Sequence, residues 1–345
     1  MGASTIRRTF RRTFWAWARL GCGAAILAVL VGRLGAEPFL DAFRLVSAWS
    51  LGVAVAVTAL TTVCCAWRWS LVAGGLGVDV RLPWAVAAYY RSQFLNTTLP
   101  GGVVGDVHRG VRQGRDVGVM GRSLRSVAWE RTLGQAVQIV LTGLVLLVLP
   151  SAARSIVLVA VVVVAAAGVA VAGVVLVAKV VPRGGQSRGG RSRDMPGLGG
   201  RIVRTVADDL RNVLVVSRAW PGIVLASGVA ATGHVVIFLV AARAAGTDAS
   251  AAQVLPLAMI VLLASAIPMN IAGWGPREGV AAWVFTAAGL GAAQGVTTAV
   301  LYGVLVLVAT LPGAAVLVAA RQLREAGRQG ASRPDDQRLE GATLG

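Results

Sequence analysis

Long apolar runs with few or no charged residues constrain this chain more than any other feature. Each of six runs reaches roughly the 20 residues that a helix needs to cross the hydrocarbon core of a bilayer. Because that core offers no water to backbone amides, a run that spans it must be helical. We therefore expect an all-α fold, a polytopic transmembrane helical bundle with about six full spans. The runs lie at residues 14–32, 45–65, 126–149, 155–178, 221–242 and 296–320.

The composition excludes a soluble globular domain. Of the 345 residues, 56% are hydrophobic and only 14% are charged, whereas soluble domains have about 25% charged residues. The first run follows a basic N-terminus, as in a signal peptide, but no small-residue cleavage site follows it. We therefore expect the run to be an uncleaved first helix.

The net charge of +18 comes mainly from arginines in the predicted loops of one side. An excess of arginine in the loops on one side is the pattern that orients proteins in the cytoplasmic membrane. We therefore expect a multi-pass protein of the cell membrane with both termini in the cytoplasm, and we do not expect a nucleic-acid partner. The predicted cytoplasmic segments are the N-terminus (1–13), a linker (183–220) and a polar tail (321–345).

The linker is rich in Gly, Ser and Arg, and it divides the chain into two transmembrane halves, 14–182 and 221–320. Each half contains one interval that fits the spanning pattern poorly, at 84–110 in the first half and 254–292 in the second. Both intervals place Pro, several Gly and a charged pair after a short apolar approach. Interrupted segments at matching positions of two halves are typical of transporter binding sites.

We interpret these intervals as two re-entrant or broken helical hairpins in inverted repeats. Two plainer alternatives stay open. The first interval could be a cytoplasmic amphipathic loop, and the second could be two short spanning helices joined by a cytoplasmic turn.

Three motifs stand out in these intervals and in the helix after the first one: Pro100, Gly101, Gly105, Asp106 and Arg109; then Glu130 and Arg131; then Pro268, Gly273, Gly275, Arg277 and Glu278. In this order they resemble the motifs of the lysylphosphatidylglycerol synthase transmembrane-region family, which includes the flippase module of the multiple peptide resistance factor. The chain departs from the family pattern at Val104 and Asn270. The resemblance implies lipid translocation. The tail is too short for the soluble aminoacyl-transfer domain of longer homologues, so we expect none.

Charged groups inside a bilayer cost about 2.5–3.5 kcal/mol each, so each needs a partner or a function. Asp106 and Arg109 share a helical face and are predicted to pair, and Arg109 could instead hold a lipid phosphate. We expect Glu130 to pair with an arginine of the first interval and Arg131 to face the headgroup path. The plainer alternative for these groups is a set of ion pairs at the membrane interface.

The glycines of both intervals could expose backbone amides to a phosphate, or could simply form turns. With Asn96, they complete the candidate translocation site. His234 is interpreted as a packing histidine, and Trp67 and Trp69 as anchors at the membrane interface. The candidate site comprises Asn96, Pro100, Gly101, Gly105, Asp106, Arg109, Glu130, Arg131, Pro268, Gly273, Gly275, Arg277 and Glu278.

No catalytic motif is present. The two histidines lie far apart, and neither a Gly-x-Ser-x-Gly sequence nor a phosphate loop occurs. We therefore expect no enzyme activity, no cofactor and no metal site.

The leading hypothesis is an integral membrane lipid translocase that moves an anionic or modified-headgroup phospholipid, or a polyprenyl-linked lipid, between leaflets. Its partners would be membrane lipids with an anionic phospholipid or polyprenyl-phosphate headgroup. The alternative is a membrane scaffold or partner of a cytoplasmic glycosyltransferase or lipid-modifying enzyme.

Overall fold

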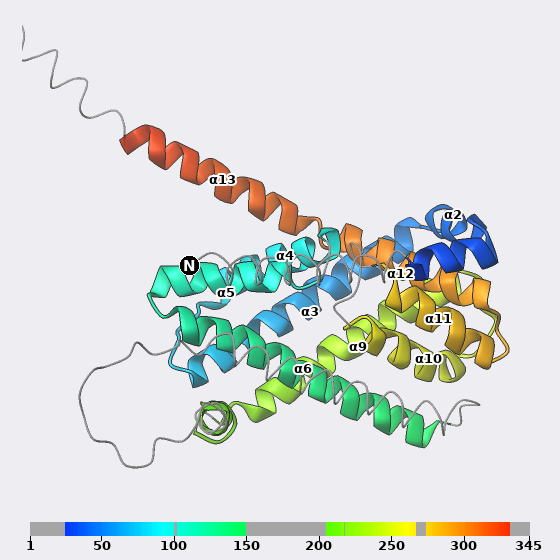
Figure 1. Cartoon of the computed structure of the whole chain (residues 1–345), viewed down its shortest axis with the longest axis horizontal. Helices are drawn as coiled ribbons and strands as arrows, with labels where there is room; N and C mark the ends of the chain where they lie inside the picture. Colours follow the sequence, from blue (N-terminus) through cyan, green and yellow to red (C-terminus); the bar gives the residue numbers. More distant parts are fainter. Residues whose placement is uncertain (1–24, 100–101, 150–204, 217, 267–273, 332–345) are drawn as a thin grey trace, which may run out of the picture.

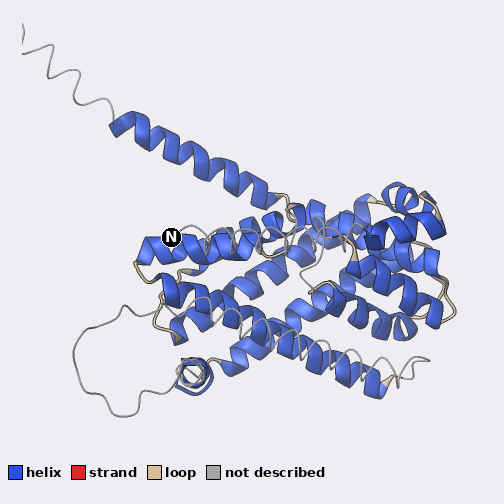
Figure 2. Cartoon of the chain, viewed as in Figure 1, coloured by secondary structure: helices blue, strands red, loops and turns tan. Residues whose placement is uncertain are grey.

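The structure is a computed structural model that describes residues 25–99, 102–149, 205–216, 218–266 and 274–331. These residues form helices joined by short connections, with no strand among them, as Figure 2 shows. The all-α prediction is thus confirmed for the described part of the chain.

The first half begins with a short helix, 25–34, and an amphipathic helix α2 (Glu37–Arg44). Helix α3 (Ala48–Gly75) starts at a capping box in which Ser47 and Ser50 satisfy each other's backbone amides. Helix α4 (Leu82–Thr98) begins with a proline in its first turn. Helices α5 (Val104–Val117) and α6 (Met120–Val148) follow, separated by Gly118 in a left-handed conformation.

The described part of the predicted linker, ahead of the second half, is a helical segment from residue 205 that ends in a π-helical stretch, η1 (Arg211–Val216). Asp209 anchors this segment to α6 by accepting hydrogen bonds from Arg125 and Trp129. The helices that follow form the rest of the bundle: α9 (Trp220–Ala244), α10 (Ala251–Ala264), α11 (Pro276–Ala287), α12 (Ala292–Ala309) and α13 (Pro312–Ala331).

Four stretches of the described chain are long and apolar enough to cross a membrane, at Ala48–Gly75, Met120–Val148, Trp220–Ala244 and Ala292–Ala320. They correspond to four of the six predicted spans. The predicted span 155–178 lies outside the described residues, and the span 14–32 is described only from residue 25. Large apolar side chains such as Val140, Leu144 and Val148 are exposed on α6, as expected of a lipid-facing surface.

Helices α3 and α9 pack against each other through the middle of the molecule (Figure 1). An apolar core joins α9, α10, α11 and α12 on one side, with Phe238 and Phe285 at its centre. A second core surrounds Trp69 and joins α3, α4, α6 and α9. Helix α13 packs against α4 near its start, where Gly313 approaches the Tyr90 carbonyl, and then projects away from the bundle. The two halves are therefore packed together.

Both predicted interruptions coincide with breaks between paired helices. The interval 84–110 contains most of α4 and the start of α5, and the interval 254–292 contains most of α10 and all of α11. Helices α4 and α5 pack closely because Gly105 has no side chain: a Cβ atom there would lie 2.0 Å from the carbonyl oxygen of Ser92. The inverted orientation of the two helix pairs in a membrane stays a prediction.

Candidate functional site

Five charged side chains form a continuous ladder between the helices of the first half. Nε of Arg68 on α3 donates to Oε1 of Glu130 at 2.9 Å, and Nη2 of Arg109 on α5 donates to Oε2 of the same carboxylate at 3.0 Å. The same Nη2 atom lies 3.0 Å from Oδ1 of Asp106, whose Oδ2 pairs with Arg131. Arginine and carboxylate thus alternate along the ladder from α3 to α6.

Arg109 is the centre of this ladder and is completely buried. Its guanidinium carbon lies 4.3 Å from the ring centroid of Trp69 and 4.3 Å from that of Tyr89. Its Nε and Nη1 atoms have no hydrogen-bond partner, so the two aromatic rings provide the cation's remaining stabilisation. The interpretation of Trp69 as an interfacial anchor is wrong, because this residue is 0% exposed and donates to Ser126.

The predicted pairs Asp106–Arg109 and Glu130 with an arginine of the first interval are both present. Arg68 was not predicted, although it is the one charge between two tryptophans at the end of an apolar run. Its Nη1 donates to Ser227 of α9 at 2.9 Å, which connects the ladder to the second half. Gly134 makes room for this guanidinium, because a Cβ atom there would lie 2.6 Å from Arg68 Nη1.

The second half contains a separate charged pair. Nε of Arg277 donates to Oε1 of Glu278 at 2.9 Å, and the other oxygen of Glu278 accepts from the amide of Gly275 at 2.6 Å. Gly275 has a φ of +129°, which only glycine adopts readily. The guanidinium also lies over the rings of Trp274 and Tyr302. Glu278 thus caps the start of α11 and neutralises Arg277.

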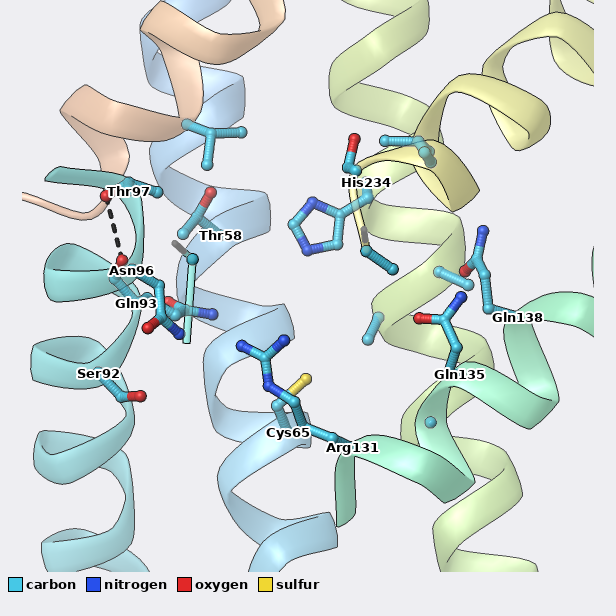
Figure 3. A pocket seen from close by; sticks show the side chains of 18 of the residues that line it. Thr58, Cys65, Ser92, Gln93, Asn96, Thr97, Arg131, Gln135, Gln138 and His234 are labelled. Carbon is cyan, nitrogen blue, oxygen red and sulfur yellow. Dashed lines mark hydrogen bonds between the residues drawn. The ribbon is translucent and has the colours of Figure 1, made fainter. Parts of the chain in front are cut away.

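A cavity of about 350 Å³ lies between these two charged groups. Helices α3, α4, α5, α6, α9, α10, α11 and α12 all contribute to its lining, so residues from both halves face it. Asn96 and Gln93 reach it from α4, and His234 reaches it from α9, as Figure 3 shows. This volume is within the range of small-ligand sites.

Helix α6 presents a polar stripe to the cavity. Arg131, Gln135 and Gln138 lie at spacings of four and three residues, which places them on one helical face, and all three are visible in Figure 3. The side chain of Arg131 is 44% exposed, so it is the accessible cation of the ladder. The two glutamines were not predicted, although their helical spacing from Arg131 inside an apolar span was a usable signal.

His234 and Tyr302 form the opposite end of the lining, with Nδ1 of the imidazole 2.9 Å from the phenol oxygen. The interpretation of His234 as a hydrogen-bonded histidine agrees with this contact, and the residue also faces the cavity. Thr58 lines the cavity from α3, and its buried Oγ1 has no hydrogen-bond partner.

The structure brings together the described members of the predicted site. Asn96, Asp106, Arg131 and Arg277 line the cavity, whereas Arg109, Glu130 and Glu278 are buried side chains that hold charged partners. Of the predicted glycines, Gly105 and Gly275 have amides that already donate to Asn96 and Glu278, so these two amides are not free to bind a phosphate. Four predicted residues lie outside the described part of the chain, namely Pro100, Gly101, Pro268 and Gly273.

No group of three or more His, Cys, Asp or Glu side chains that could hold a metal occurs within the described ranges. Cys64 and Cys65 are free thiols. The polar groups of the described cavity lining are guanidinium, carboxylate, amide, hydroxyl, imidazole and thiol groups.

A family model described as the lysylphosphatidylglycerol synthase TM region matches residues 16–313. Neither a curated protein nor a solved structure matches the chain significantly.

Proposed function

The chain belongs to the lysylphosphatidylglycerol synthase transmembrane-region family, and on this premise we propose that it is a lipid translocase of the cell membrane. The proposed cargo is a lipid with a phosphate-containing headgroup. The headgroup would pass through the cavity between the two halves while the acyl chains stay in the surrounding lipid.

One observation carries this proposal: a cavity with a half-exposed arginine lies inside a bundle whose outer surface is apolar. A charged headgroup that crosses the hydrocarbon core unaided loses its hydration at a large cost in free energy. A cavity with guanidinium and amide donors would replace part of that hydration and lower the barrier.

Arg131 is the proposed phosphate ligand. Its guanidinium pairs with Asp106 and extends from α6 into the cavity (Figure 3). A guanidinium binds phosphate oxygens through several fixed donors, so Arg131 could retain Asp106 and bind the headgroup with its other N–H groups. The buried ladder behind it would fix the position of Asp106 during transport.

The test is transport in vesicles. The purified protein is reconstituted into liposomes that contain a fluorescent anionic phospholipid, and the accessibility of the label to a membrane-impermeant quencher is followed over time. The wild-type protein should accelerate exchange between leaflets. Arg131→Ala should reduce the rate at least about tenfold, the factor for loss of a charge-assisted contact of roughly 1.4 kcal/mol.

The matched control is Arg44→Ala, because Arg44 is 78% exposed on α2 and lies outside the cavity. It should transport at the wild-type rate. Wild-type exchange no faster than in protein-free liposomes across anionic phospholipids and polyprenyl-phosphate lipids would contradict the proposal. It would favour a scaffold for a lipid-modifying enzyme.

A further inference from the structure

We propose that the cavity selects a phosphate group that carries a polyol or a sugar, and that it rejects a cationic aminoacyl headgroup. This inference rests on the proposed function, because it names the substrate class of the same cavity. Three features of the lining carry it: the saturation of its carboxylate, the surplus of positive charge, and two buried polar atoms without partners.

Among the described residues that line the cavity, Asp106 is the one carboxylate. Its Oδ1 accepts from Ser92 at 3.0 Å and from Arg109 at 3.0 Å. Its Oδ2 accepts from Asn96 at 2.9 Å and pairs with Arg131. A carboxylate offers about four acceptor positions, so no position remains for the ammonium group of an aminoacyl ester.

The other two carboxylates near the cavity, Glu130 and Glu278, lie behind arginines and are 0% exposed. The ladder and the separate pair of the second half together contain four arginines and three carboxylates. This leaves a surplus of one positive charge. A phosphodiester of charge −1 neutralises this surplus, whereas a headgroup with an added ammonium does not. The group comprises Arg68, Arg109, Arg131 and Arg277 with Asp106, Glu130 and Glu278.

Two polar atoms on different helices indicate which substituent the lipid phosphate carries. Thr58 Oγ1 on α3 and Gln138 Nε2 on α6 are buried without hydrogen-bond partners, and both residues line the cavity. Buried polar atoms in native proteins are nearly always bonded, so an orphaned atom on a residue of the cavity wall is a candidate contact for a bound molecule. Nε2 is a donor and needs an acceptor, which a hydroxyl oxygen supplies and an ammonium group does not.

The spacing along α6 matches a headgroup of two parts. At a rise of about 1.5 Å per residue, Gln135 lies about 6 Å and Gln138 about 10 Å along the axis from Arg131. A phosphate at Arg131 would therefore place the hydroxyls of its substituent beside the two glutamines. Gln93 on α4 adds another amide on the opposite side of the cavity (Figure 3), and its Oε1 accepts from Thr62 at 2.9 Å.

The experiment compares four phospholipids with the same fluorescent acyl chain in the liposome assay. They are phosphatidylinositol, phosphatidylglycerol, lysylphosphatidylglycerol and phosphatidylmethanol, whose phosphate carries no hydroxyl. A fifth arm uses a glucosyl polyprenyl phosphate, which presents the same chemistry on a different anchor. The polyol lipids should move at least fivefold faster than phosphatidylmethanol and tenfold faster than lysylphosphatidylglycerol. If the glucosyl polyprenyl phosphate exchanges faster than the phospholipids, the preferred lipid anchor is a polyprenyl chain and the inferred headgroup chemistry stays the same.

The variant Thr58→Val with Gln138→Leu removes the two orphaned polar atoms and preserves side-chain size. Replacement of an unsatisfied buried polar atom by an apolar one is nearly neutral for folding. The double variant should lower the ratio of phosphatidylinositol to phosphatidylmethanol rates about fivefold or more. The control is Gln113→Leu, since Gln113 is also buried and unpartnered but does not line the cavity. It should leave the ratio unchanged.

Transport of lysylphosphatidylglycerol at or above the phosphatidylglycerol rate would overturn the inference and leave the translocase proposal intact. An unchanged rate ratio in the double variant would also overturn it, because the orphaned atoms would then not meet the cargo. If no lipid in any arm moves, the translocase proposal fails and the inference fails with it.

Discussion

Nη2 of Arg109 lies 3.0 Å from Oε2 of Glu130, and both side chains are completely buried. Glu130 also neutralises Arg68 and accepts from the hydroxyl of Tyr89 at 3.2 Å. One carboxylate therefore holds two cations and connects α3, α4, α5 and α6. Removal of one partner of a buried ion pair is strongly destabilising, because the other charge stays buried without compensation.

We therefore predict that Glu130→Ala lowers the free energy of unfolding by about 3–5 kcal/mol. The measurement is thermal unfolding of the purified protein in detergent, followed by intrinsic tryptophan fluorescence. The control is Asp41→Ala, which breaks an exposed pair with Arg44 and should cost less than about 1 kcal/mol. Equal stability of the two variants would mean that the ladder contributes little to folding.

Gly105→Ala tests the close contact of α4 and α5. An added Cβ atom would lie 2.0 Å from the Ser92 carbonyl oxygen, so the two helices must separate. Because Asp106 follows directly and bonds to Ser92 and Asn96 of α4, the separation should also displace the carboxylate of the cavity. We expect a loss of about 1–3 kcal/mol in stability and slower lipid exchange.

The control for this change is Gly52→Ala on α3, where an added Cβ atom has no heavy atom within 4 Å. Alanine favours a helix over glycine by up to about 1 kcal/mol, so this variant should be unchanged or slightly more stable. A stable and fully active Gly105→Ala variant would show that α4 and α5 tolerate separation.

The sequence predicted the helical class, the four candidate membrane spans of the described chain and the positions of both interruptions. All of these depend on local hydropathy and on Pro and Gly. It also predicted the pair Asp106–Arg109, whose members are close in the chain. Arg68 and Ser227 are 159 positions apart, and nothing local in either segment indicates the other. Contacts of that kind depend on the packing of α3 against α9, which single-sequence patterns do not specify.

The orientation in the membrane is a prediction from the distribution of arginines. In a variant without Cys22, Cys64 and Cys65, the single substitutions Gly185→Cys and Asp248→Cys should differ in how the new cysteine is labelled in intact cells. A membrane-impermeant maleimide should label the residue between α9 and α10 and should not label the linker. Labelling of the linker from outside would reverse the predicted topology and place both termini outside.

Arg277 and Glu278 allow the folding role of a buried pair to be separated from its role in the cavity. Glu278 is 0% exposed and also caps the start of α11, whereas Arg277 lines the cavity. Arg277→Met leaves a buried carboxylate without its cation, and Glu278→Gln leaves a cation without its carboxylate. Each single change should cost about 3–5 kcal/mol in stability. The double variant should be more stable than either single variant, because no isolated buried charge remains.

The two readouts should then diverge in the double variant. Its unfolding temperature in detergent should recover most of the loss, since the introduced glutamine can still accept from the amide of Gly275 and the introduced methionine can fill much of the space of the arginine stem. Lipid exchange in liposomes should stay low if the Arg277 guanidinium contacts the headgroup, because the cavity has then lost a cation that folding does not need. Recovery of both stability and exchange would restrict the headgroup contacts to Arg131 and the polar stripe of α6. If the double variant instead loses as much stability as the two single variants together, the pair is not coupled in the folded protein.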